Sequence, residues 1–437
     1  MLSGMNKYPL LIKLAILAVI TLLLVAVLGE IRGLAHERQA RQREAEQNVE
    51  QSLAGPQTLL GPILLRQCTE TWAPYKDGTQ TRNFTQRLAP DKLQVSGELV
   101  PEPRHRGLFK VNTYASKLTL LAHWDDLSGL VPRPENAGGR IECSDAMAMF
   151  SAKDVRGLRK VELTRDGRAL AVRPGTMDGI YTSGLHAVLQ APQAGEHLDL
   201  RLVVELAGTQ SLAVVPAASD PIVTLESGWP HPSFSGRFLP TSSDVSEDGF
   251  KARWQVTELA SGASADVMAG NGNLDVLAVE LIDPVNPYVM SDRAIKYGLI
   301  FIALTFVTVG LTELLTGRRV HPVQYLLVGL ALSLFFLLLL SLSEHLPFVV
   351  AYLIAAGAAA AVLTQYAAAM LGGWLRGLAF GSGVALLYGA LYVLLSREQT
   401  ALVIGAVLLF AVLSVVMALT RKLDWYRLGG ERNVEAG

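Results

Sequence analysis

Residues 8–29 read YPLLIKLAILAVITLLLVAVLG, with Lys13 as the single charge. An α-helix needs about 20 apolar residues to cross a hydrocarbon core of roughly 30 Å, so this stretch predicts a transmembrane helix. Five further apolar stretches are crowded into the last third of the chain. They cover residues 295–316, 323–342, 348–371, 377–395 and 401–419. The predicted fold class is a multi-pass α-helical membrane protein with six transmembrane helices and a large domain inserted between the first two.

The first apolar stretch stands where a signal peptide would stand. Its run is longer than the apolar core of a signal peptide, and Gly29-Glu30-Ile31 behind it is not a small-x-small cleavage site. We therefore expect an uncleaved anchor helix.

Basic residues in the short segments between helices predict the orientation, because they collect on the cytoplasmic side. On one side of the membrane these short segments contain a single basic residue, Arg397. The other side has Lys7, Arg318, Arg319, Arg376, Arg421, Lys422, Arg427 and Arg432. We expect both termini in the cytoplasm and the inserted domain outside it. The predicted parts are a cytoplasmic N-terminus with its anchor (1–29), an exported stalk helix and domain (30–295), a five-helix bundle (296–420) and a cytoplasmic tail (421–437).

The inserted region, residues 30–295, holds 27 basic and 33 acidic residues, a net charge of −6. This mildly acidic surface argues against nucleic acid or anionic lipid as its main partner. Both cysteines, Cys68 and Cys143, fall in this region, where an oxidising compartment would permit a disulfide. Two buried free thiols explain them equally well. The sequence has no CxxC pair or Cys/His cluster, so we expect no metal site.

The inserted region begins as a helix and continues as strands. Residues 31–53 are polar with mixed charge, as in a solvated stalk helix. Beyond them apolar and polar residues alternate, most clearly over 198–206, and turn pairs such as Asp166-Gly167 separate the runs. The other candidate strands are residues 93–99, 110–124, 160–163, 169–172, 187–190, 222–225, 249–256 and 276–281. We expect a mainly β domain of sandwich or curled-sheet type.

The chain lacks four sequence motifs that carry a recognised chemistry: GxSxG, HExxH, the P-loop and GxGxxG. We therefore predict no catalytic residue and no cofactor. A hydrolase without a recognisable motif stays a minor alternative.

Five polar residues lie in or near the C-terminal apolar stretches, where ionisable groups are costly and are functional candidates by default. They are Glu313, His321, Gln324, Glu344 and His345. One interpretation is that these side chains line a proton or ion path. The other is structural: Glu313 would pair with Arg318 or Arg319 at the membrane boundary. Glu344 and His345 would belong to a solvated loop. We favour the structural interpretation because most of the five are close to helix ends, where the cost is small.

Gly373, Gly377 and Gly381 are spaced by four at the start of the fifth predicted helix. Such a face lets another helix approach closely. The run AAGAAAA at 355–361 has matching small residues. We expect these two helices to pack within one chain.

The chain resembles the CreD family of bacterial inner-membrane proteins, described as cell-envelope integrity proteins. The motifs that carry the resemblance are GPQ at 55–57, GP at 61–62, DVRG at 154–157, WPHPSF at 229–234, FLP at 238–240, GFKARW at 249–254, DRAIKY at 292–297, HPVQYLLVG at 321–329, SEH at 343–345 and DWY at 424–426. The two cysteines are not part of this pattern. The resemblance implies a plasma-membrane protein with a periplasmic domain, expression under a two-component system and a link to envelope stress. It implies no catalytic residues.

Two functional hypotheses follow. The first is a non-catalytic envelope-integrity protein whose periplasmic β domain binds or senses an envelope component or protein. The second is a transporter or ion channel that uses the polar residues of the C-terminal bundle. The expected partners are the lipid bilayer and an unidentified periplasmic component, and not nucleic acid. The sequence does not indicate the oligomeric state.

Overall fold

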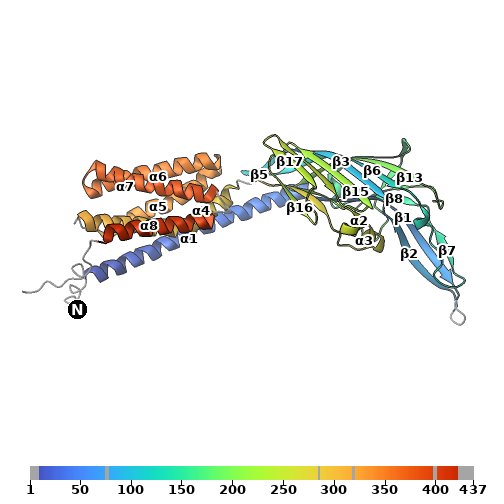
Figure 1. Cartoon of the computed structure of the whole chain (residues 1–437), viewed down its shortest axis with the longest axis horizontal. Coiled ribbons are helices and arrows are strands. Elements are labelled where there is room, and N and C mark those ends of the chain that lie inside the picture. The colour runs from blue at the N-terminus through green and yellow to red at the C-terminus, as the bar shows by residue number, and fades with distance from the viewer. Residues whose placement is uncertain (1–8, 74–77, 284–285, 317–319, 397–400, 422–437) are drawn as a thin grey trace, which may run out of the picture. The chain divides into compact units, whose positions relative to one another are not determined.

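The computed structural model describes the chain except for residues 1–8, 74–77, 284–285, 317–319, 397–400 and 422–437. The chain divides into two compact units (Figure 1). The helical unit takes Met1–Arg41 and Val285–Gly437, and the β unit takes Gln42–Pro284. The division therefore falls about ten residues away from each of the boundaries at 30 and 295 that hydropathy indicates.

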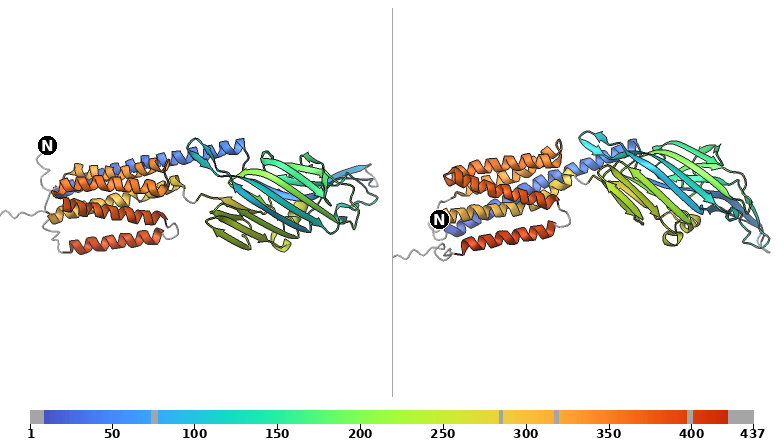
Figure 2. Two further views of the ribbon diagram at one scale, coloured as in Figure 1. Left: turned by 90° about the horizontal axis from the view of Figure 1, so that it is seen from above. Right: turned by 45° about the horizontal axis from the view of Figure 1, so that its top comes forward.

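The helical unit contains six helices among its described residues. They are α1 (Pro9–Ser52), α4 (Pro287–Thr316), α5 (Pro322–Ser343), α6 (Phe348–Leu371), α7 (Trp374–Ser396) and α8 (Ala401–Thr420). Five of them, α1 and α4 to α7, are long and apolar enough to cross a membrane, and four of these five belong to the C-terminal region. In α8 the apolar stretch is shorter, Val403–Ala418. Figure 2 shows the helices of this unit side by side along a common direction.

The first helix is a single element of 44 residues, where the sequence indicates an anchor followed by a separate stalk. No proline interrupts its backbone hydrogen bonds after the apolar stretch, and Gly29 and Gly33 are accommodated within it. Glu37 and Arg41 add an ion pair of 2.7 Å one turn apart. The helix ends before Pro56, which cannot continue it.

Within the helical unit, leucine side chains of α1 pack against glycines of α4 and α5. Leu24 is fully buried, and Leu28 is almost so. A methyl group on Gly298 of α4 would come within 3.0 Å of Leu28, and one on Gly329 of α5 would overlap Leu24. Glycine thus allows the close approach on which helix packing in a membrane depends.

The β unit contains two large sheets. The first consists of β1 (Gln57–Trp72), β2 (Gln80–Leu88), β7 (Arg140–Cys143), β8 (Met147–Ala152), β11 (Val172–Pro174), β12 (Gly184–Val188), β14 (Ser211–Val214), β16 (Pro232–Gly236) and β19 (Leu277–Leu281). Its strand order is β11-β12-β8-β1-β14-β19-β16, and β2 and β7 also pair with β1. The second consists of β3 (Lys92–Pro101), β6 (Thr113–Trp124), β9 (Leu158–Arg165), β10 (Arg168–Leu170), β13 (Leu198–Thr209), β15 (Asp220–Ser227), β17 (Ser242–Ser246) and β18 (Gly249–Gln255). Its strand order is β10-β9-β13-β6-β3-β15-β18-β17. Smaller elements are the hairpin of β4 (Arg104–Arg106) and β5 (Phe109–Val111), two single-turn 3₁₀ helices, and the helices α2 (Glu258–Ser261) and α3 (Ala263–Ala269). The expectation of a large, mainly β domain is confirmed.

The main core of the β unit lies between the two sheets. Leu64 and Phe150 of the first sheet and Leu93 and Trp124 of the second belong to one buried cluster, and each is at most 1% exposed. The inward residues of β13 alternate with exposed ones, as the sequence of 198–206 predicts. The second sheet therefore has one face in the core and one face in solvent.

The first sheet is covered on part of its other face as well. Leu60, Ile63 and Leu65 of β1 belong to a second buried cluster that includes Tyr181 and Val267, the latter from α3. A strand that is buried on both faces reads as a continuous apolar run. For this reason the alternation of the sequence does not reveal β1, although it is the longest strand.

Charge complementarity supports the register of the solvated face. Glu205 of β13 lies opposite Lys160 of β9 and Lys117 of β6, and Lys117 lies opposite Glu98 of β3. Opposite charges at facing positions of neighbouring strands are favourable, whereas a shift by one residue would bury them.

Candidate functional site

Glu313, near the C-terminal end of α4, forms an ion pair with α1. The Lys13 ammonium donates to both Glu313 carboxylate oxygens at 2.5 Å and to the Val320 carbonyl at 3.3 Å. The Tyr325 hydroxyl of α5 donates to Glu313 Oε2 at 3.1 Å. The side chains of Lys13 and Glu313 are 26% and 16% exposed. One largely buried charge pair therefore connects three helices.

Sequence reasoning did not find this partner. Arg318 and Arg319, the predicted partners of Glu313, lie outside the described residues. A lysine near the start of an apolar helix ordinarily extends to the headgroups, so Lys13 gives no sign of a carboxylate 300 residues away. One signal was available: Lys13 is the only charge of its stretch, and Glu313 is the only acid in the five C-terminal stretches.

His321 and Gln324 form a capping box at the start of α5. His321 Nδ1 accepts a hydrogen bond from the Val323 backbone N–H at 3.3 Å, and Gln324 Oε1 accepts one from the His321 backbone N–H at 3.0 Å. The first N–H groups of a helix have no partner within the helix, and a capping box satisfies two of them. Both candidate side chains therefore serve the helix start.

Asp292 is the centre of a second charged cluster, near the other end of α4. It accepts one hydrogen bond from Arg32 Nε at 2.9 Å, and Lys296 Nζ lies 3.0 Å from its other oxygen. His36 Nε2 is 3.1 Å from the same carboxylate. Arg32 and His36 are one turn apart on α1, as are Asp292 and Lys296 on α4, so two helix faces meet at this carboxylate.

The two clusters are separated by about the thickness of a bilayer's hydrocarbon core. Lys13 and Arg32 are 19 residues apart on α1, and Asp292 and Glu313 are 21 residues apart on α4. At 1.5 Å per residue these separations are about 28 and 32 Å, close to the roughly 30 Å of a hydrocarbon core. The clusters therefore join two antiparallel helices at both ends of their membrane-spanning length.

Glu344 and His345 lie at the opposite end of α5 from the capping box. Glu344 follows the last residue of α5 and pairs with Arg38 Nε at 3.2 Å, with its own side chain 10% exposed. His345 is exposed in the turn after it. The five polar candidates thus lie at the two ends of α5. Glu313, with Lys13, lies beside the start of α5, where His321 and Gln324 cap the helix. Glu344 and His345 lie at its other end.

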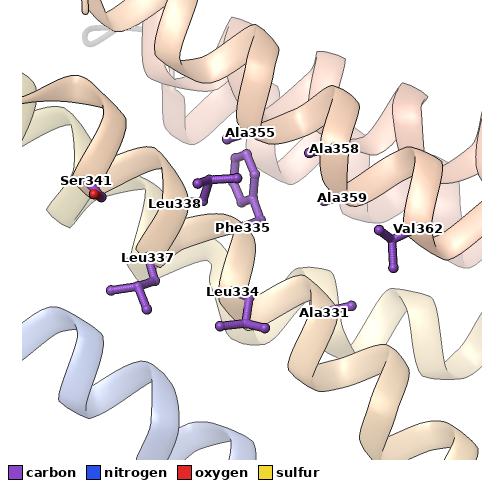
Figure 3. Close-up of a pocket in the computed structure, with 10 residues that line it drawn as sticks. All are labelled: Ala331, Leu334, Phe335, Leu337, Leu338, Ser341, Ala355, Ala358, Ala359 and Val362. Carbon is purple, nitrogen blue, oxygen red and sulfur yellow. The ribbon is translucent and has the colours of Figure 1, made fainter. Parts of the chain in front are cut away.

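Two grooves among the described residues of the helical unit are lined mainly by apolar side chains. A groove of about 460 Å³ between α5 and α6 is shown in Figure 3, where Ser341 is the one labelled side chain that carries a polar atom. Another of about 450 Å³ lies between α4, α7 and α8, with Thr305 and Thr308 in its lining. None of the five candidates lines either groove. Among the described residues no three His, Cys, Asp or Glu side chains gather as metal ligands would.

Two of the three spaced glycines face α6. A methyl group on Gly377 would lie 2.5 Å from the Ala368 Cβ, and one on Gly381 would overlap Thr364. Gly373 has no neighbour within 4 Å of that position, and neither has Gly357 of the alanine run. The α6 side of the contact therefore lies after residues 355–361, closer to the end of α6.

In the β unit, Asp154 and Arg156 hold the end of α1. The Asp154 carboxylate accepts hydrogen bonds from the Gly55 N–H at 3.0 Å and from Arg156 Nε and Nη2 at 2.9 and 2.5 Å. Arg156 also donates to the carbonyls of Glu50 and Gln51 at 3.2 and 2.5 Å. These carbonyls lie in the last turn of α1, where they lack partners in the helix and a positive charge is favourable. We call Asp154, Arg156 and their partners the α1 joint.

The pKa of Asp154 reflects this bonding. The hydrogen bond from Arg156 lowers the pKa to about 2, with help from the backbone N–H groups of Gly55 and Arg156 and against the effect of partial burial. Gln57, which is 1% exposed, donates to the Asp154 and Ala207 carbonyls at 2.9 and 3.3 Å. The GPQ and DVRG motifs thus meet in one joint, and their role there is positional.

The structure bonds Cys68 to Cys143, the alternative that the sequence left open beside two free thiols. The cysteines face each other at paired positions of β1 and β7, with Cα atoms 4.1 Å apart. Glu70, two residues along β1, is fully buried and accepts hydrogen bonds from the backbone N–H groups of Glu135 and Asn136, both at 2.9 Å. The disulfide and this carboxylate together attach β7 and the segment before it to β1.

A comparison with protein families shows the family of the chain. The model of the family described as inner membrane protein CreD matches residues 9–426. The chain belongs to the CreD family. The inner membrane protein CreD of Escherichia coli (strain K12) is 36% identical over 433 residues, which cover 97% of this chain and 95% of that protein. The resemblance seen in the motifs is confirmed, and the chain is a membrane protein of an inner-membrane family.

Solved structures add little to this result. Chains of an M1 zinc metallopeptidase from Deinococcus radiodurans match 44% of this chain and 42% of their own length at 12% identity. Their TM-scores are 0.25 and 0.23. At these values the likeness carries no argument about the CreD chain.

Proposed function

We propose that this CreD-family protein is a non-catalytic, membrane-anchored binding protein with a role in cell-envelope integrity. Its β unit lies in the periplasm and binds or senses an envelope component or protein. Its helical unit anchors it in the inner membrane, with both termini in the cytoplasm. One observation carries the proposal: the five polar candidates lie at the two ends of α5, where Glu313 and Glu344 pair with bases of α1 and His321 and Gln324 cap the helix. None of the five lines either of the two described grooves.

Two features of the β unit support this assignment. A disulfide such as Cys68–Cys143 persists in an oxidising compartment, as the periplasm is. The α1 joint fixes the last turn of an anchor helix through charged hydrogen bonds, which are about twice as strong as neutral ones. A change in the β unit would therefore act directly on the end of α1.

The test exchanges the charges of the Lys13–Glu313 pair. Lys13→Glu combined with Glu313→Lys keeps an ion pair between α1 and α4 but moves the carboxylate to the other helix. A deletion strain under envelope stress is complemented with this variant, and the amount of protein in the membrane is measured by immunoblotting. We expect the double exchange to restore growth, because the pair is structural. Glu313→Lys alone should lower the amount in the membrane, since two like charges would then face each other.

Glu313→Gln is the matched control, because it removes the charge and keeps the shape. If the role is structural, this variant complements once its membrane level is raised by higher expression. A normal amount of inert protein, for this variant or for the double exchange, would show that position 313 needs an ionisable carboxylate. That result would replace the anchor proposal with a proton or ion path.

A further inference from the structure

The Asp292 cluster holds more positive than negative charge. Within the described residues Asp292 is the only acid in contact with Arg32, His36 and Lys296. The Asp292 side chain is 12% exposed, whereas those of Arg32, His36 and Lys296 are 44%, 54% and 49% exposed. One nearly buried carboxylate is thus surrounded by three basic groups that extend outwards.

Two other charged contacts among the described residues of the helical unit are balanced. Lys13 with Glu313 and Arg38 with Glu344 are pairs of one base with one acid. Glu30, two residues before Arg32, does not offset the excess, because two residues rotate a side chain by about 200° to the other side of α1. Unlike these two pairs, the cluster around Asp292 has an excess of positive charge.

Donors remain free at this cluster. Arg32 reaches Asp292 through Nε, and in the described part of the chain its two Nη groups have no acceptor. A guanidinium has five N–H donors and an ammonium three, so Lys296 also keeps donors beyond its contact with Asp292. Asp292 holds both side chains in place, so little conformational entropy would be lost on binding an anion.

The position of the cluster at the membrane boundary indicates which anion it would meet. Asp292 lies about 32 Å along α4 from Glu313, one hydrocarbon thickness, so both clusters lie at membrane boundaries. At that depth the phosphates of lipid headgroups surround the protein. Arginine and lysine bind phosphate through charge-assisted hydrogen bonds, and basic pockets between transmembrane helices bind headgroups in this way.

We propose that Arg32, His36 and Lys296 form a binding site for the headgroup phosphate of a membrane lipid. The phosphate accepts hydrogen bonds from the Nη groups of Arg32 and from Lys296, while Asp292 orients both. Since these residues come from α1 and α4, a bound lipid joins the two helices. The site belongs to the helical unit and does not depend on what the β unit binds.

The test measures lipid binding to the purified full chain by native mass spectrometry in detergent. Phosphatidylglycerol is compared with a diacylglycerol that has the same acyl chains but no phosphate. A basic residue near anionic lipid contributes about a fivefold gain in affinity, so Arg32→Gln with Lys296→Gln should weaken phosphatidylglycerol binding about 25-fold. Diacylglycerol binding should stay unchanged.

Arg41→Gln with Arg43→Gln is the matched control, because it removes the same charge from exposed positions further along α1. We expect it to bind phosphatidylglycerol as the unmodified chain does. Arg32→Lys with Lys296→Arg preserves the charge and should retain most of the binding, which separates loss of the site from misfolding. Equal loss in the control variant would mean diffuse attraction and would overturn the site. Displacement of the lipid by millimolar inorganic phosphate would assign the site to free phosphate and would overturn the lipid assignment.

Discussion

Asp154→Asn is the change that most directly measures the α1 joint. The substitution keeps the size of the side chain and removes the charge that binds Arg156 and the Gly55 N–H. The pKa of Asp154 falls from 3.8 to about 2 in the folded protein. One pKa unit corresponds to about 1.4 kcal/mol, so the charge stabilises the folded state by about 2 kcal/mol at neutral pH.

The sign of the pH dependence follows from the lowered pKa. A carboxylate whose pKa is depressed by folding stabilises the protein above its unfolded pKa, and this contribution is lost as the pH falls through the folded value. The difference between the unmodified chain and Asp154→Asn should be complete from pH 6 to 8. By pH 3 it should fall to about half.

The assay is thermal unfolding of the full chain in detergent, followed by near-ultraviolet circular dichroism. Trp124 and Trp254 are buried in the core of the β unit and report its tertiary packing. For a unit of this size about 2 kcal/mol lowers the Tm by roughly 4 to 8 °C. Asp248→Asn, at an exposed position in the turn between β17 and β18, is the control and should leave the Tm unchanged. An unchanged Tm for Asp154→Asn at pH 7, or a loss of the same size at pH 3, would refute the reasoning.

Three further predictions concern other parts of the chain. Gly377→Leu should destabilise the helical unit by about 1–3 kcal/mol, because its side chain would overlap α6; an unchanged Tm in detergent would contradict the glycine contact. Hydrogen bonds from His123 to Asp199, the stronger effect, and to Asp125 raise the pKa of His123. The stability that protonated His123 contributes is therefore present below its ordinary pKa of 6.5 and is lost as the pH rises through its pKa in the folded protein. His123→Gln should therefore differ from the unmodified chain more at pH 5.5 than at pH 9, as seen by Tm. Reporter fusions at Met268 and at the C-terminus should report opposite compartments, and agreement between them would refute the proposed orientation.

The alternation of residues predicted much of the β unit, but only where one face of a strand is in solvent. Residues 198–206 are part of β13, whose inward leucines are buried and whose outward side chains are exposed. The apolar run from Leu59 to Leu65 in β1 gave no such pattern, because that part of the strand is buried on both faces. The sequence cannot separate a doubly covered strand from other buried segments, since burial on both sides removes the periodicity.

Of the candidate site, the sequence indicated single residues and only the structure showed their partners. The capping box of His321 and Gln324 is local, three residues apart, and in principle readable from spacing. The partners of Glu313 and Asp154 are distant in the chain: Lys13 is 300 residues from Glu313, and Gly55 is 99 residues from Asp154. The order of the motifs along the chain therefore indicates the family, whereas the contacts among the motifs are visible only in the structure.

The sequence by itself determined that this chain is a membrane protein with a large, mainly β insertion, because the length of an apolar helix and the alternation of a half-buried strand are local properties. Only the tertiary structure decided that Lys13 neutralises Glu313, that Arg32, His36 and Lys296 surround Asp292, and that Asp154 and Arg156 hold the end of α1. Ion pairs of this kind depend on which side chains are brought within about 3 Å of each other. That distance is set by how helices and strands pack, and the order of residues along the chain does not encode it locally.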